Sequence, residues 1–128
     1  MHTKLLMRWS ALFLGVLGAA ASFMPQEILI RYGTAPSGAG VLLVQILGSL
    51  YLGFAILNWM ARDILIGGIY ARPVALGNFL HFAVVALTLW KAIGGGTFRG
   101  SQIIAGAIVY SVFALWFGLV LFGHPSKE

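Results

Sequence analysis

No charged side chain interrupts QIIAGAIVYSVFALWFGLVLF, the stretch formed by residues 102–122. A helix rises about 1.5 Å per residue, so roughly 20 residues cross the hydrocarbon core of a bilayer, which is about 30 Å thick. Three further stretches of similar length and composition precede it, at about residues 5–24, 41–60 and 73–92. The sequence therefore predicts an all-α fold, a transmembrane four-helix bundle with short loops.

The composition indicates a single integral membrane domain over residues 1–128. Hydrophobic residues make up 60% of the chain and charged residues 9%, whereas soluble domains carry about 25% charged residues. We attribute the net charge of +5 to contact with anionic membrane lipids rather than with nucleic acid, because no surface that combines basic and aromatic residues is evident. The chain has no cysteine, which excludes disulfides, thiolate metal sites and a cysteine nucleophile.

A short helix is expected directly after the first span. Pro25 ends that span, because proline cannot continue a helix without losing a backbone hydrogen bond. Glu27 and Arg31 are four residues apart and could pair on one side of a helix, with apolar residues on the other side. Residues 26–32 are therefore predicted to form a helix lying in the membrane interface, followed by a flexible link over residues 33–40.

Turn and cap residues set the remaining boundaries. Gly67 and Gly68 lie in the second loop, and Pro73 suits the first turn of the third span. The run Gly94-Gly95-Gly96 stops that span, and Ser101 is the expected N-cap of the fourth.

The distribution of Lys and Arg predicts the orientation. If the N-terminus is inside, five of these residues lie inside and three outside, which places both termini in the cytoplasm. The inner residues are Lys4, Arg8, Arg62, Arg72 and Lys127, and the outer ones are Arg31, Lys91 and Arg99. The basic start and the apolar run ending at residues 19–21 also resemble a signal peptide; we expect this segment to be retained, and its removal would leave three spans.

Small residues at helical spacing predict where the spans pack. Lipid tails are as apolar as leucine, so helices in a membrane associate through close packing and hydrogen bonds. The first, second and fourth spans each carry such a seam. In the first span it consists of Ala11, Gly15 and Ala19, with Gly18 and Ser22 beside them. In the second span it consists of Gly48, Ser49 and Gly53, and in the fourth of Gly106, Ala114 and Gly118. One of these seams could also form a homo-oligomer or join a larger membrane complex.

Polar residues inside the spans mark the candidate site, because burying them in lipid is costly. His81 is eight residues beyond Pro73, or about 12 Å, which places it near mid-membrane. The predicted polar cluster consists of His81, Asn78, Gln45, Ser49, Thr88 and Tyr110. His81 has three open interpretations: a structural hydrogen bond between helices, contact with a ligand or proton, or ligation of a haem.

Three further residues are assigned to the membrane interface. Arg62 and Arg72 are expected to anchor the chain or to bind lipid headgroups, and Asn58 is expected to cap backbone groups or to bind headgroups. Only one histidine is embedded and no carboxylate is, which argues against a metal site, a bis-histidine haem, ion-coupled transport and Ser-His-Asp catalysis. No catalytic residue, metal ligand or cofactor is therefore predicted, apart from haem or quinone under the redox hypothesis below.

Three local patterns carry a family resemblance. They are Pro25-x-Glu27 after the first span, Gln45-x-x-Gly48 in the second, and Arg72-Pro73-x-x-x-Gly77-Asn78 entering the third. In these features and in its four-span layout the whole chain resembles the DoxX-like small bacterial membrane proteins. The resemblance implies a bacterial inner-membrane location, and some members of that group are associated with quinone-linked oxidoreductases; it transfers no functional residue to this chain.

Three functional hypotheses follow. The first is a non-catalytic membrane protein that binds lipid or a hydrophobic ligand, or that serves as an accessory subunit of a larger complex. The second is a small channel or transporter that uses Gln45, Asn78 and His81. The third is a redox subunit that binds quinone or haem through His81.

Overall fold

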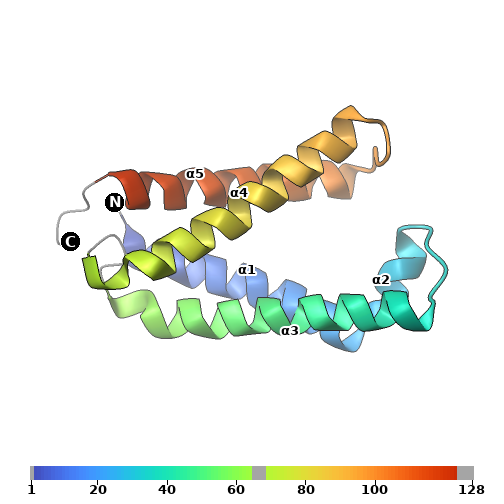
Figure 1. Ribbon diagram of the computed structural model, residues 1–128, viewed down its shortest axis with the longest axis horizontal. Helices are drawn as coiled ribbons and strands as arrows, with labels where there is room; N and C mark the ends of the chain where they lie inside the picture. The colour runs from blue at the N-terminus through green and yellow to red at the C-terminus, as the bar shows by residue number, and fades with distance from the viewer. Residues whose placement is uncertain (1, 65–68, 124–128) are drawn as a thin grey trace. The chain divides into compact units, whose positions relative to one another are not determined.

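The computed structural model describes residues 2–64 and 69–123, which form helices and short connections (Figure 1). No strand occurs among these residues, which confirms the predicted all-α fold. Gly67, Gly68 and Lys127, named in the sequence predictions, lie outside the described residues. In chain order the elements are α1 (Thr3–Phe23), α2 (Pro25–Arg31), α3 (Gly38–Met60), η1 (Ala61–Asp63), η2 (Ile69–Ala71), α4 (Arg72–Gly94) and α5 (Ser101–Phe122).

Four helices, α1, α3, α4 and α5, are long and apolar enough to cross a membrane. The chain is a multi-pass membrane protein by this criterion. On α5 the side chains of Leu115 and Leu119 are 70% and 64% exposed, and on α4 Leu87 is 70% exposed. Large apolar side chains on the outer faces are expected where lipid, rather than water, surrounds a helix.

The short helix predicted after the first span is confirmed as α2, with Pro25 in its first turn. The flexible link is shorter than predicted, because α3 begins at Gly38. The Ser37 side chain accepts a hydrogen bond from the Gly40 backbone N–H at 3.2 Å and caps this helix. An N-cap hydroxyl satisfies a backbone donor that has no partner within the helix, so the helix starts earlier than the apolar run.

The run Gly94-Gly95-Gly96 ends α4, as predicted, with Gly94 as its last residue and Gly95 as its C-cap. Gly96 has a φ of 72°, its N–H donates to the Ile93 carbonyl at 3.1 Å, and the Thr97 N–H donates to the Ala92 carbonyl at 3.1 Å. This pair of bonds is a Schellman motif, which requires a left-handed residue just beyond the helix and therefore favours glycine. The predicted cap of the following helix is wrong by one residue, since Gly100 is the N-cap and Ser101 is already helical.

The chain divides into two compact units. The first, called here the α1–α3 unit, is Met7–Ala61 and holds most of α1 with α2 and α3. The second, the α4–α5 unit, consists of Met1–Leu6 and Arg62–Glu128.

Within the α1–α3 unit, the two long helices approach most closely at two glycines. A Cβ built at Gly18 would lie 2.8 Å from the Leu52 backbone nitrogen, and one built at Gly48 would lie 2.7 Å from the Ser22 nitrogen. The predicted seam on α1 is therefore confirmed at Gly18 and Ser22. On α3 the seam packs against α1 at Gly48, whereas no described atom lies within 4 Å of a Cβ built at Gly53.

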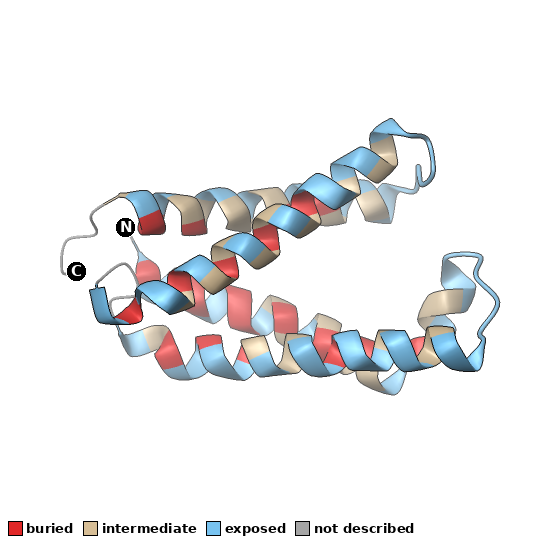
Figure 2. Cartoon of the chain, viewed as in Figure 1, coloured by how far each residue is buried: buried red, intermediate tan, exposed pale blue. Residues whose placement is uncertain are grey.

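Within the α4–α5 unit, the buried residues of α4 recur every three or four positions and form one face (Figure 2). They are Ala75, Asn78, Phe82 and Ala86. The two helices run antiparallel, because the Trp90 indole donates to the Ser111 hydroxyl at 2.9 Å while Phe79 and Phe122, near the opposite ends, pack edge to face. A Cβ built at Gly118 would lie 3.2 Å from the Phe79 ring, so the predicted seam of α5 does face α4 there.

Candidate functional site

Two members of the predicted polar cluster meet in the α4–α5 unit. The His81 ring lies 5.8 Å from the Tyr110 ring and 5.1 Å from the Phe82 ring, measured between centroids. Phe82 in turn stacks on Phe113 and Phe117, at 4.9 Å and 5.6 Å. His81 is half-buried and Tyr110 is 5% exposed. The imidazole therefore lies at the edge of an aromatic cluster.

The other predicted residues of α4 bond to their own helix. The Asn78 amide donates to the Val74 carbonyl at 2.9 Å, and the Thr88 hydroxyl donates to the Val84 carbonyl at 2.8 Å. Asn78 is fully buried, whereas Thr88 is exposed. Such bonds to the preceding turn are common for polar side chains within helices.

Gln45 and Ser49 belong to the α1–α3 unit, and both are exposed there. The Ser49 hydroxyl donates to the Ile46 carbonyl of its own helix at 2.7 Å. The structure thus brings His81 and Tyr110 into ring contact and places Gln45 and Ser49 on an exposed face of α3. A function for the six residues as one cluster stays a prediction.

Asn58 differs most from its expected position at the headgroups. Its side chain is 0% exposed, and its amide donates to the Ser10 hydroxyl of α1 at 3.0 Å. The Ser10 hydroxyl donates onward to the Met7 carbonyl at 3.1 Å. Asn58 is buried because it shares the packed face of α3 with Gly48 and Ala55. Sequence reasoning missed Ser10, although it precedes the small residues of α1 that form the packed face.

The two predicted interfacial arginines lie in the α4–α5 unit. Arg62 Nε is 3.6 Å from a carboxylate oxygen of Asp63, and the other oxygen is 2.6 Å from Lys4 Nζ. Arg72 is exposed in the first turn of α4. Exposed ion pairs of this kind contribute about 0–1 kcal/mol, so these contacts add little to stability.

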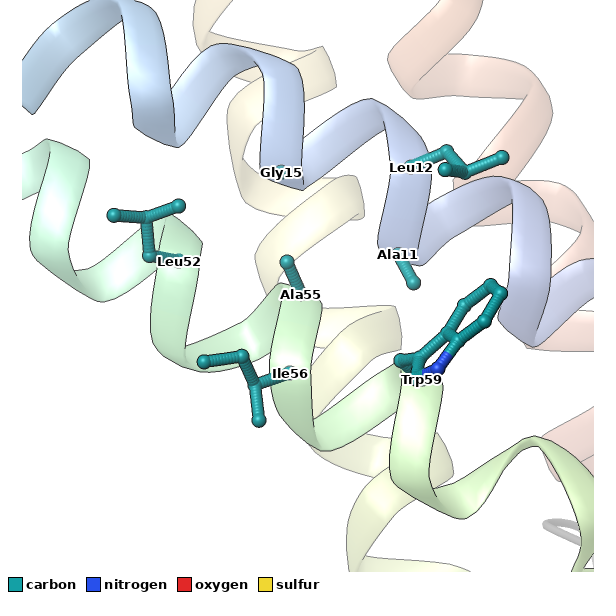
Figure 3. A pocket seen from close by; sticks show the side chains of 7 residues that line it. All are labelled: Ala11, Leu12, Gly15, Leu52, Ala55, Ile56 and Trp59. Carbon is teal, nitrogen blue, oxygen red and sulfur yellow. The ribbon is translucent and has the colours of Figure 1, made fainter.

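A groove of about 360 Å³, absent from the sequence predictions, runs between α1 and α3 (Figure 3). Its lining is Ala11, Leu12 and Gly15 from α1, and Leu52, Ala55, Ile56 and Trp59 from α3. All seven side chains are apolar or aromatic, and the indole N–H of Trp59 is the polar group that they contribute. Ligand sites typically have volumes of about 300–1,000 Å³ and a mostly apolar lining with a few polar groups.

Small residues form the floor of the groove and large ones its walls. Ala11 and Ala55 are 5% and 7% exposed, whereas Leu12, Ile56 and Trp59 are 52%, 62% and 45% exposed. A Cβ built at Gly15 would lie 3.7 Å from the Ala55 Cβ, so the floor is narrow there. The groove is thus open along its side.

Among residues 2–64 and 69–123, no group of three or more His, Asp or Glu side chains could hold a metal ion. Comparison with models of protein families, with curated proteins and with solved structures finds no match to this chain.

Proposed function

We propose that this protein is a non-catalytic membrane protein that binds the hydrocarbon chain of a lipid, or a hydrophobic ligand of similar shape, in the groove between α1 and α3. The observation that carries the proposal is the groove itself, which combines a floor of small residues with exposed apolar walls. Each buried methylene contributes about 0.8 kcal/mol when it leaves water. A chain that already lies in lipid gains less, so its binding depends on packing against the groove walls.

The dimensions of the groove suit an extended chain. Leu52 and Trp59 are seven residues apart on one face of α3, which corresponds to about 10 Å along the helix. On α1, Ala11 and Gly15 line the groove one turn apart along the helix axis. The groove is therefore elongated parallel to the helices, as a lipid chain in a bilayer is.

The test compares lipid retention in two variants. Leu12→Ala with Ile56→Ala removes the two exposed walls, and Leu87→Ala with Leu115→Ala removes leucines of similar exposure from the α4–α5 unit. After stepwise removal of lipid in detergent, native mass spectrometry of the unmodified chain and of the second variant should show a retained lipid, and the first variant should lose it. Equal retention in all three proteins, or none in the unmodified chain, would contradict the proposal.

A second candidate function, as an accessory subunit or homo-oligomer, is favoured by one face of α3. Ser49 is exposed, and a Cβ at Gly53 meets no described atom within 4 Å, so this small-residue face has room for another helix. Small residues of this kind allow close helix contact in membranes. Gly53→Leu should then dissociate a complex detected by cross-linking, and an unchanged cross-linking pattern would exclude this use of the face.

We also propose the bacterial inner membrane as the location, with both termini in the cytoplasm. The resemblance to DoxX-like proteins supports the location, and the excess of basic residues on one side, five against three, supports the orientation. A reporter enzyme that works only in the cytoplasm should be active when it is fused after residue 128. Activity of a reporter that works only outside the cytoplasm would reverse the orientation.

A further inference from the structure

We infer that the groove selects an anionic phospholipid, with the lipid chain between α1 and α3 and the phosphate group at Arg8. This inference rests on the proposed lipid binding and names the class of lipid. It depends on where Arg8 lies relative to the groove and on the charges within the α1–α3 unit.

Arg8 continues the groove face of α1. Ala11, Leu12 and Gly15 follow it at three, four and seven residues, the spacing of side chains that share one face of a helix. Arg8 itself is exposed and lies one turn nearer the start of α1 than the groove lining. A long arginine side chain at this position extends the apolar groove with a cationic end.

The polar end of the groove lies near Trp59. The two helices run antiparallel, because Asn58 bonds to Ser10 while Gly18 approaches Leu52. Figure 3 shows Trp59 at the end of the groove where α3 finishes. Arg8 precedes Ser10 by two residues, and Ser10 bonds to Asn58, so Arg8 lies at this same end of α1. The last turn of a membrane-spanning helix, with an exposed tryptophan, is typical of the headgroup level.

The charge at this end favours an anion. Within Met7–Ala61 the charged residues are Arg8, Glu27 and Arg31, and the latter two lie in α2, beyond the far end of α1. The unit therefore presents a cation at the polar end of the groove, and Asp63, the carboxylate that follows α3 in the sequence, is already paired with Lys4 and Arg62. A guanidinium binds a phosphate through paired hydrogen bonds, and in an anionic lipid no cationic headgroup competes with it for that phosphate.

The expected preference can be estimated. A basic residue near an anionic membrane surface contributes about 1 kcal/mol, which corresponds to roughly fivefold in binding. We therefore expect phosphatidylglycerol to bind at the groove about fivefold more strongly than phosphatidylcholine with the same chains. Most of this difference should disappear at high salt, since the Debye length falls from about 10 Å at 0.1 M to about 3 Å at 1 M.

The experiment uses Trp59 as a local reporter. Trp9, Trp90 and Trp116 are replaced by phenylalanine, which leaves Trp59 in the groove as the sole tryptophan. The protein is reconstituted in mixtures of phosphatidylglycerol and phosphatidylcholine, with bromine on the chains of one lipid at a time. Quenching of Trp59 then gives the relative binding constant of the two lipids at the groove.

Variants in this background separate the possible outcomes. Arg8→Gln should reduce the preference to about one, Arg8→Lys should keep most of it, and Arg31→Gln, which removes the same charge at the other end of the unit, should leave it unchanged. Should Arg8→Gln fail to insert, the salt titration of the parent protein decides instead. A preference near one in the parent, a preference that Arg8→Gln leaves unchanged, or a preference that salt does not lower would overturn the inference. Lipid retention that depends on Leu12 and Ile56 would still support the proposed function in that case.

Discussion

Gly48→Ala should destabilise the α1–α3 unit, and the structure gives the size of the effect. The new Cβ would lie 2.5 Å from the Ser22 hydroxyl oxygen and 2.7 Å from the Ser22 backbone nitrogen. The hydroxyl can rotate away, but the backbone nitrogen moves only if α1 shifts away from α3. Forcing an extra methyl group into a packed contact costs about 1–3 kcal/mol.

Gly53→Ala is the matched control, because it makes the same change on the same helix with no described atom within 4 Å. Replacing glycine by alanine inside a helix favours the helix by about 1 kcal/mol, and this gain is common to both variants. The difference between them therefore isolates the packing cost, so Gly48→Ala should be about 1–3 kcal/mol less stable than Gly53→Ala.

The assay is reversible unfolding in mixed micelles with increasing sodium dodecyl sulfate, followed by far-ultraviolet circular dichroism. Equal free energies of unfolding for the two alanine variants would refute the close approach of α1 and α3 at Gly48. Gly18→Ala offers a second measurement of the same contact, since its Cβ would lie 2.8 Å from the Leu52 nitrogen.

Three further predictions concern other contacts, all measured by the same unfolding assay. Asn58→Leu and Ser10→Ala should couple by about 0.6–1.7 kcal/mol in a double-mutant cycle, which is the range for hydrogen bonds between membrane helices. Additive effects would show that the 3.0 Å bond from the Asn58 amide to the Ser10 hydroxyl contributes nothing to stability. Gly96→Ala should lower the free energy of unfolding by about 1–2 kcal/mol, because Gly96 has a φ of 72°. Gly94→Ala, within the helix, should not lower it, and equal stabilities of the two variants would show that the left-handed conformation is not needed. His81→Phe keeps the ring contacts with Phe82 and Tyr110 and should be about 0.5–1.5 kcal/mol more stable than His81→Ala, whereas equal losses would favour a polar role for the imidazole.

The sequence predicted the elements of this fold well, because length and composition decide them. Four apolar stretches became α1, α3, α4 and α5, and the pattern around Glu27 and Arg31 became α2. Errors arose at the ends of helices. Ser101 was predicted as a cap, but Gly100 takes that position, and the Ser37 side chain starts α3 before its apolar run.

Which helix faces pack together was harder to predict. In a soluble helix one face is apolar and identifies the core, but a membrane helix such as α3 is apolar on every side. Ser49 and Gly53 formed as good a stripe in the sequence as Gly48 with Ala55, yet the structure buries the latter pair. The choice depends on the fit of α1 to α3, which no pattern within one helix contains.

The candidate site shows the same limit. The polar side chains of the spans were identifiable one by one, but Asn78 and Thr88 bond to their own helix and Asn58 to Ser10. The groove is lined by ordinary apolar residues, and its existence depends on the pairing of Ala11 and Gly15 with Ala55. A groove between two helices cannot be recognised before their register is known.

Labelling of single cysteines with a membrane-impermeant maleimide tests the central claim, four crossings of the membrane, most directly. The chain has no native cysteine, so cysteines placed one at a time at His2, Thr34, Tyr70 and Thr97 report their own positions, all of which are exposed. The four spans predict that His2 and Tyr70 react from one side of sealed vesicles and that Thr34 and Thr97 react from the other. Reaction of all four positions from the same side, or of Thr34 from the side of His2, would contradict this account.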